Sequence, residues 1–216
     1  MKRFFLAVFV LFFLISPARG LGKEDEVRTA LDLLESTYRS VTSLRARFIQ
    51  SEERPGVGVS TSEEGRMSFM PPGKMRWDYK GKRPHRVVIN DNLVWIYTPG
   101  RNQVVRREMS LQEMRIGPMT FMRGLESLEE QFRVYPGSDI HEGKYSLDLF
   151  PIDEKTSYER IGILISTQTG LLERIRIHHR LGNLTTIEFS DIRTGVKFPD
   201  DLFEWDIPEG TKIIEP

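Results

Sequence analysis

The sequence predicts a mainly β protein with some helix, in which a long antiparallel sheet curls into a barrel or half-barrel. The first observation is a two-residue period within residues 65–97, where the apolar Met75, Trp77 and Tyr79 alternate with charged residues and therefore share one face of a strand. The second is that about ten to twelve such segments are joined by hairpin-length links, which makes neighbours antiparallel and favours curling over a flat sheet. The third is that helical spacing is confined to residues 23–41 and 110–132.

The first 20 residues have the pattern of a cleaved signal peptide. A basic start at Lys2 and Arg3 precedes an unbroken apolar run over residues 4–15, and Ala18 and Gly20 have the spacing of a signal peptidase site. This run is too short to span a bilayer comfortably. We therefore expect an exported, soluble protein of the periplasm. Residues 1–20 would be removed and residues 21–216 would form a single domain, because no linker or internal repeat divides them.

Charge and cysteine content exclude several classes of function. The full chain has 31 basic and 31 acidic residues; without residues 1–20, which hold Lys2, Arg3 and Arg19, 28 basic residues face 31 acidic ones and the net charge is −3. A negative domain argues against nucleic-acid binding. Because the chain has no cysteine, disulfides, thiolate metal sites, a cysteine nucleophile and a lipidated N-terminal cysteine are all excluded.

Residues 23–41 are expected to form an amphipathic helix. Apolar residues recur there at three- and four-residue spacing, as Leu31, Leu34 and Tyr38 do. Acidic residues 24–26 would occupy the first turn, where they suit the helix dipole.

From Leu44 onward the two-residue period predicts strands, separated by turn residues such as Pro55–Gly58, Pro71–Gly73 and Asn90–Asn92. The expected strands are 44–51, 59–70, 74–80, 86–89, 93–98, 103–107, 132–135, 144–150, 160–166, 171–180 and 184–193. Residues 110–132 interrupt this pattern with helical spacing that breaks at Gly117-Pro118, which predicts two short helices joined there.

Motifs that would indicate an enzyme are absent from the sequence. It contains no Gly-rich phosphate loop, no His-Glu-x-x-His and no Gly-x-Ser-x-Gly. His178 and His179 would point to opposite faces of a strand and could not hold one metal ion together. We therefore expect a protein that is not an enzyme and has no metal or cofactor.

Four segments follow one another in an order that suggests a family. They are Phe48-Ile-Gln50 after the N-terminal helix, Gly65 to Trp77 with its Pro-Gly-Lys-Met-Arg-Trp core, residues 88–97, and the ending Phe203-Glu-Trp-Asp-Ile-Pro-Glu-Gly210. In this order and spacing, and behind a signal peptide, the chain resembles the LolA family of periplasmic lipoprotein carriers over nearly the whole mature sequence.

The resemblance implies an incomplete, unclosed antiparallel β-barrel with an N-terminal helix and a helical lid over an apolar cavity. It implies a chaperone that takes the acyl chains of lipoproteins from an inner-membrane ABC transporter of the lipoprotein-release type and ferries them to an outer-membrane acceptor. We expect a monomer whose partners are these acylated lipoproteins, the transporter and the acceptor, and not nucleic acid. Residues 110–132 would close over the barrel mouth when the carrier is empty.

Twelve apolar residues are the candidates for lipid contact, from the strands of residues 65–97 and from the 110–132 segment. They are Met67, Phe69, Met75, Trp77, Ile89, Trp95, Ile116, Met119, Phe121, Met122, Leu125 and Leu128. Apolar strand residues are by default ordinary core. The resemblance favours cavity lining instead, and methionine side chains suit an adaptable apolar surface.

The sequence departs from the family at two places. Pro71 stands where the family has an arginine directly before a proline, an arginine held to help close the lid; Arg66 and Arg76 are candidates for a substitute donor. The chain also stops shortly after Gly210, so we expect it to lack the extra strand that family members with a long C-terminal extension carry.

Three alternatives remain beside the lipoprotein carrier. The same fold could carry another amphiphile, such as a glycolipid or a lipid ester, because fold does not fix cargo. It could also serve as a lipoprotein-sensing interaction module, although such sensors commonly carry a second domain. A lipid hydrolase would need a nucleophile, and neither Ser68 nor Thr120 has an evident base beside it.

Overall fold

A computed structural model describes residues 22–109, 128–139, 141–205 and 208–215. The expected signal peptide and the 110–127 part of the expected lid lie outside these residues. Helix α1 comes first, and single-turn helices η1, η2 and α4 lie between strands; their bounds are Lys23–Ser40, Pro55–Val57, Pro99–Arg101 and Leu128–Gln131.

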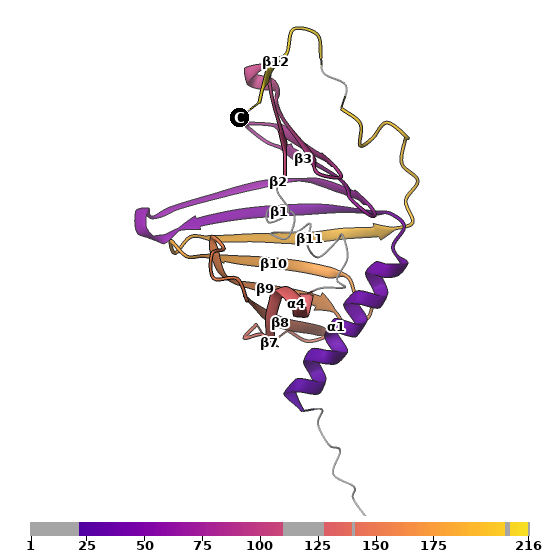
Figure 1. Cartoon of the computed structure of the whole chain (residues 1–216), viewed down its shortest axis with the longest axis vertical. Coiled ribbons are helices and arrows are strands. Elements are labelled where there is room, and N and C mark those ends of the chain that lie inside the picture. Colours follow the sequence, from indigo (N-terminus) through magenta and orange to yellow (C-terminus); the bar gives the residue numbers. More distant parts are fainter. Residues whose placement is uncertain (1–21, 110–127, 140, 206–207, 216) are drawn as a thin grey trace, which may run out of the picture.

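The strands of the described chain form one twelve-stranded sheet, in the order β12-β6-β5-β4-β3-β2-β1-β11-β10-β9-β8-β7 (Figure 1). Their bounds are β1 Leu44–Arg54, β2 Val59–Met70, β3 Lys74–Lys80, β4 His85–Asn90, β5 Leu93–Thr98, β6 Gln103–Glu108, β7 Phe132–Pro136, β8 Lys144–Pro151, β9 Tyr158–Ser166, β10 Leu172–His179, β11 Leu184–Thr194 and β12 Lys212–Ile214. β12 and β7 lie at opposite edges, so the sheet is not closed, and the predicted incomplete β-barrel is confirmed.

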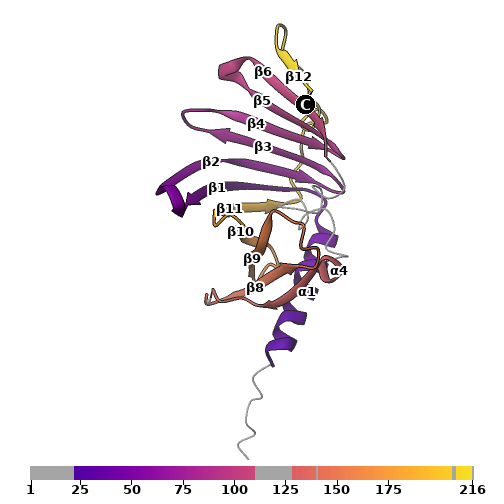
Figure 2. The ribbon, with the colours of Figure 1, turned by 60° about the vertical axis from the view of Figure 1, so that its left-hand side comes forward.

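Short turns make the neighbours antiparallel, as the sequence indicated. Asp91 in the β4–β5 turn and Asn102 after η2 have φ values of 55° and 45°, a left-handed conformation that Asn and Asp adopt more readily than most residues. Figure 2 shows β1 to β6 stacked in chain order above β11.

Strand β12 corrects one prediction. We expected no extra C-terminal strand, yet Lys212 to Ile214 pair with Gln103 to Val105 of β6, and this pairing is parallel. β12 begins 18 residues after the end of β11 and is not joined to β6 by a hairpin, so no tight turn forces an antiparallel direction.

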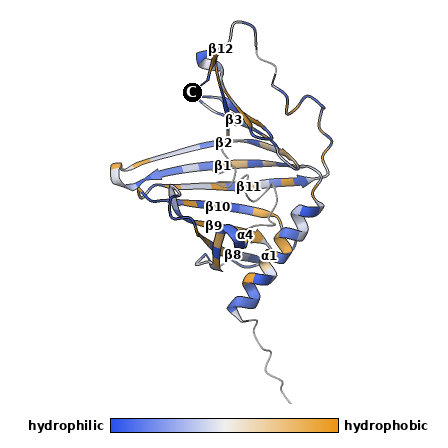
Figure 3. Cartoon of the chain, viewed as in Figure 1, coloured by the Kyte–Doolittle hydropathy of each residue, from blue (hydrophilic) through white to orange (hydrophobic). Residues whose placement is uncertain are grey.

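The sheet has an inner face, defined here as the face that carries Phe48, Met75 and Ile163, and an outer face opposite. The inner face is apolar because strand residues alternate, and its buried side chains form one core with those of α1, such as Leu34 and Tyr38. Figure 3 shows the hydrophobic and hydrophilic residues alternating along the strands. Helix α1 packs against β7 and β8, so it covers only one end of the sheet (Figure 1).

The outer face is crossed by the C-terminal segment, residues 196–205. This segment leaves the end of β11 and runs along the sheet to β12, shown in yellow in Figure 1. Ser43 Oγ donates a hydrogen bond to the carbonyl of Val196 at 2.8 Å, and Arg76 donates to the carbonyl of Leu202 at 3.2 Å. Phe203 is buried, 1 % exposed. The outer face therefore has its own apolar contact beneath this segment.

Candidate functional site

Two rows of apolar side chains cross the inner face from β2 to β5. In the first row Phe69 lies opposite Met75, Met75 opposite Ile89, and Ile89 opposite Val94. In the antiparallel register these side chains are nearest neighbours, so they form a continuous apolar strip. All four are buried, and Phe69 and Met75 are 0 % exposed.

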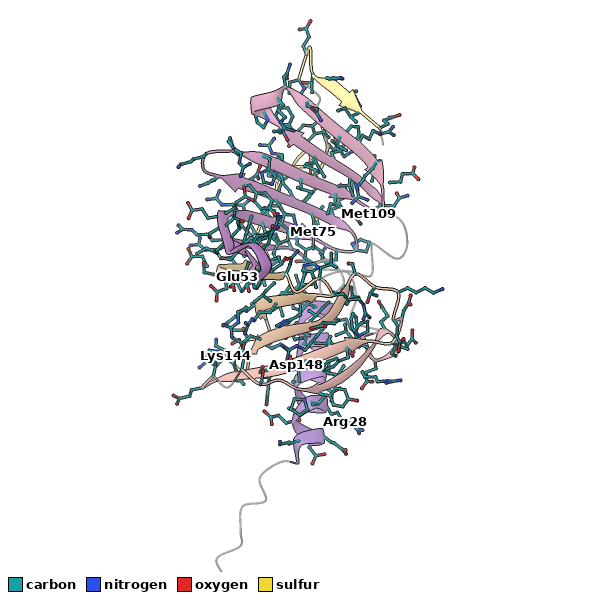
Figure 4. The ribbon with its side chains drawn as sticks, turned by 90° about the vertical axis from the view of Figure 1, so that its left-hand side faces the viewer. Arg28, Glu53, Met75, Met109, Lys144 and Asp148 are labelled. Carbon is teal, nitrogen blue, oxygen red and sulfur yellow. The ribbon has the colours of Figure 1, made fainter. Side chains whose placement is uncertain are left out.

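The second row lies one pleat along and continues the same surface. Met67 is opposite Trp77, Trp77 opposite Val87, and Val87 opposite Ile96. Together the rows give β2, β3, β4 and β5 a broad apolar strip. The charged residues of the same face, Glu63 of β2 and Arg107 of β6, lie outside the two rows. Figure 4 labels Met75 on the strands of this half of the sheet.

An aromatic cluster borders these rows. The ring centroids of Phe48 and Trp77 lie 4.7 Å apart, and those of Phe48 and Tyr79 4.9 Å apart, both edge to face. Gly65 makes room for the Phe48 ring, because a Cβ there would lie 2.8 Å from two ring carbons and 2.2 Å from the carbonyl oxygen of Asp78. The tight contact explains why a glycine interrupts β2.

Tyr79 forms a polar rim at the end of the apolar face. Its hydroxyl donates a hydrogen bond to Gln50 Oε1 at 2.9 Å, and its ring stacks on His85 at 4.0 Å. Burial, together with the nearby charges of Glu63 and Glu52, raises the pKa of Tyr79 to about 12. The rim therefore presents a neutral hydroxyl at physiological pH.

Six of the twelve predicted site residues are buried on described elements in or beside the inner core: Met67, Phe69, Met75, Trp77, Ile89 and Leu128. Five others lie outside the described residues: Ile116, Met119, Phe121, Met122 and Leu125. The rows also contain Val87, Val94 and Ile96, which were not among the twelve. Residues 93–97 are apolar at every position, so alternation alone does not show which of them face inward.

Trp95 does not share the face of Met75, contrary to expectation. It lies opposite Val88, which lies opposite Arg76, so all three belong to the outer face. The cause is the two-residue turn Asp91-Asn92: it pairs Asn90 with Leu93 and so places Val94, rather than Trp95, beside Ile89. The guanidinium of Arg106 lies over the Trp95 ring, 5.3 Å from its centroid.

Arg66 and Arg76, the suggested substitutes for the family arginine at Pro71, also lie on the outer face. Arg66 is opposite Asp78 in the β2–β3 register. Arg76 donates to Asp78 Oδ2 at 2.8 Å and to the carbonyl of Leu202. Arg76 therefore fastens the C-terminal segment and does not reach the inner face.

The described residues also bear on the question of a metal site. Within those ranges, no three His, Cys, Asp or Glu side chains gather as a metal site would require. Nor does any helix in the described part of the chain have the length and apolarity needed to cross a membrane.

Comparison with known proteins supports the fold and the family. Residues 39–206 match the family model described as outer membrane lipoprotein carrier protein LolA. An outer-membrane lipoprotein carrier protein of Legionella pneumophila (strain Lens) is 26% identical over 219 residues, covering 100% of both chains. One from Methylobacillus flagellatus is 25% identical over 186 residues, covering 85% of this chain and 88% of the relative.

A solved structure of an uncharacterized conserved protein from Thermus thermophilus is similar in fold. It has a TM-score of 0.56 and 14% identity, with 88% of this chain and 98% of that chain covered. At this identity the likeness concerns the fold alone.

Proposed function

Because this chain belongs to the outer membrane lipoprotein carrier protein LolA family, we propose that its inner apolar face binds the acyl chains of lipoproteins during their passage across the periplasm. The supporting observation is the pair of apolar rows that crosses β2 to β5 without a charged side chain. Acyl chains offer only dispersion and hydrophobic contact, and this surface is suited to the same interactions.

The energetics explain why lipoproteins need a carrier. At about 0.8 kcal/mol per CH₂, an acyl chain of about 15 methylenes gains roughly 12 kcal/mol on leaving water. A lipoprotein with several such chains would therefore not cross an aqueous compartment unaided. A carrier that buried every methylene would also not release its cargo, so partial shielding and a competing acceptor are part of the proposal.

The proposed route begins at an inner-membrane transporter of the lipoprotein-release type and ends at an outer-membrane acceptor. The sequence has no phosphate-binding loop, so the energy for loading would come from the transporter. Unloading would follow the difference in affinity between the carrier and the acceptor. The 110–132 segment would cover the apolar face in the empty protein and move aside for cargo.

Depletion of the protein in its native host, followed by fractionation of the two membranes, tests this function. We expect lipoproteins to accumulate at the inner membrane and the wild-type gene to restore their distribution. Met75→Glu should fail to restore it, because its carboxylate would interrupt the first apolar row. Lys74→Glu is the matched control, since Lys74 lies next in β3 and points to the outer face.

An unchanged lipoprotein distribution after depletion would contradict the proposal. Lipid extraction from the purified protein, followed by mass spectrometry, would then identify a different amphiphile if the same face carries one.

A further inference from the structure

We propose that the outer face of β11, β1 and β2 forms a groove that docks an extended, acidic segment of a partner protein. Two pairs of arginines face each other across these strands: Arg45 is opposite Arg193, and Arg47 is opposite Arg66. Like charges directly opposite in a sheet are destabilising. All four arginines line one hollow, and this arrangement, which costs stability, indicates a surface that binds an anionic ligand.

The chain itself compensates these charges only weakly. Arg47 pairs with Asp191 at 3.0 Å, but both side chains are more than half exposed, so water screens the pair. Within the described part of the chain, the side chains of Arg66 and Arg193 form no ion pair or hydrogen bond, although Asp78 lies opposite Arg66 in the sheet. The Arg45 guanidinium lies over the Phe198 ring, 4.9 Å from its centroid. Lys80 and Glu64, which lie opposite each other, also line the groove.

A second arginine cluster on the outer face provides the contrast. On β9 and β10, Arg160 pairs with Asp148, while Arg174 and Arg176 both pair with Asp139, each at 3.1 Å. These arginines have carboxylate partners and are explained as structure. Of the four arginines in the groove between β11 and β2, Arg47 alone has an ion pair among the described residues, and that pair is exposed, which separates the groove from an ordinary network of sheet salt bridges.

The shape of the outer surface suits an extended peptide better than a flat protein surface. Two hollows of about 370 and 270 Å³ lie side by side, and Arg47 and Arg66 line both of them. Ile49, 46 % exposed, lines one hollow and offers an apolar contact. The other hollow reaches Val196, where the C-terminal segment begins.

The spacing of the arginines favours an extended peptide. Arg45 and Arg47 are two residues apart on β1, so their Cα atoms are separated by roughly 7 Å along the strand. Alternate side chains of an extended peptide have the same repeat. A peptide lying along β1 with acidic residues at alternate positions would therefore meet successive arginines, and Arg–carboxylate pairs add directional hydrogen bonds to the charge attraction.

The groove and the proposed acyl-binding surface are on opposite faces of the sheet. A partner could therefore dock while cargo is held, and the two proposals fail independently of each other. Loss of peptide binding would leave the inner-face proposal untouched.

Binding of a fluorescein-labelled peptide of about ten residues, with alternating Glu and Ser, to the full mature protein tests the groove. Arg66→Glu should weaken binding roughly tenfold or more, the loss expected for a charged hydrogen bond. The same change places a carboxylate opposite Arg47 on one side and opposite Asp78 on the other, so the two effects offset each other and the melting temperature should stay close to that of the wild type. Arg54→Glu, at the far exposed end of β1, is the control with equal charge change and should bind the peptide like wild type.

Three results would overturn the proposal. Equal loss of affinity in Arg54→Glu would mean that only net charge matters. If Arg66→Glu still binds the peptide but has a lower melting temperature, Arg66 stabilises the fold and does not bind the partner. Binding to vesicles of anionic phospholipid without binding to the peptide would make the surface a membrane contact.

Discussion

At the scale of single residues, Asp78 connects β3 and β4 to the C-terminal segment. Its carboxylate accepts hydrogen bonds from Arg76 at 2.8 Å and from Arg86 at 2.6 Å. Arg76 in turn holds the carbonyl of Leu202, and Arg86 lies 5.7 Å from the Trp205 ring centroid. One carboxylate thus orients both arginines that face this segment.

We predict that Asp78→Asn lowers the free energy of unfolding by about 1–2 kcal/mol at neutral pH, because two charged hydrogen bonds weaken. Burial alone would raise the pKa of Asp78, but the hydrogen bonds and charges of Arg76 and Arg86 lower it below its ordinary value of 3.8. A lowered native pKa contributes stability above the unfolded-state pKa, and this contribution is lost as pH falls through the native pKa.

Urea unfolding at neutral pH and at about pH 3 checks this prediction, since the difference between wild type and Asp78→Asn should shrink in acid. Asp191→Asn is the control: its pair with Arg47 is exposed, so we expect little change at either pH. An equal loss in both variants would remove the special role of Asp78.

For single residues, the sequence predicts well which side chains share a face within one strand, and predicts poorly how neighbouring strands are aligned. Alternation placed Met75 and Trp77 correctly on one face, because the period within a strand is fixed by the backbone. Trp95 was placed wrongly because its face depends on how many residues the preceding turn contains.

At the scale of elements, α1 docks on the sheet through close contacts at the β9–β10 turn. Gly170 in that turn has φ +67°, and a Cβ there would lie 2.0 Å from Thr37 Oγ1 and 2.9 Å from the carbonyl of Leu33. The Tyr38 hydroxyl accepts a hydrogen bond from the buried Leu172 N–H at 3.3 Å. The turn and the helix therefore fit each other without space for a further atom.

We predict that Gly170→Ala destabilises the protein by about 1–3 kcal/mol more than Gly182→Ala does. Both glycines have positive φ, so both variants carry the same kind of backbone strain, but a Cβ on Gly182 would meet nothing within 4 Å. The difference in melting temperature isolates the helix contact. Equal destabilisation would mean that α1 adjusts its position freely.

Most strands were predictable because turn residues such as Asn90 to Asn92 separate clear alternating runs. β12 was not, because a three-residue strand carries little pattern and its partner β6 lies far away in the chain. Sequence periodicity reports local structure. The pairing of β12 with β6 is a long-range contact, so periodicity does not predict it.

At the scale of the whole molecule, one unclosed sheet separates two surfaces of different character. The inner face has an apolar core from β2 to β10, with Phe69, Met75 and Ile175 all 0 % exposed, and a polar rim at Tyr79 and Gln50. The outer face carries Arg66, Arg76 and Asp78, and the C-terminal segment crosses it. If the two proposals hold, single substitutions at adjacent residues of one strand will alter the cargo contact and the partner contact independently.

The most direct measurement of the central claim is site-specific photocrosslinking to a lipoprotein with radiolabelled acyl chains. A photoreactive residue at position 75 should label the acyl chains, because Met75 lies in the first apolar row of the inner face. The same residue at position 74, which replaces Lys74 on the outer face, should not. Equal labelling from both positions, or labelling from position 74 alone, would contradict the assignment of the inner face as the acyl-binding surface.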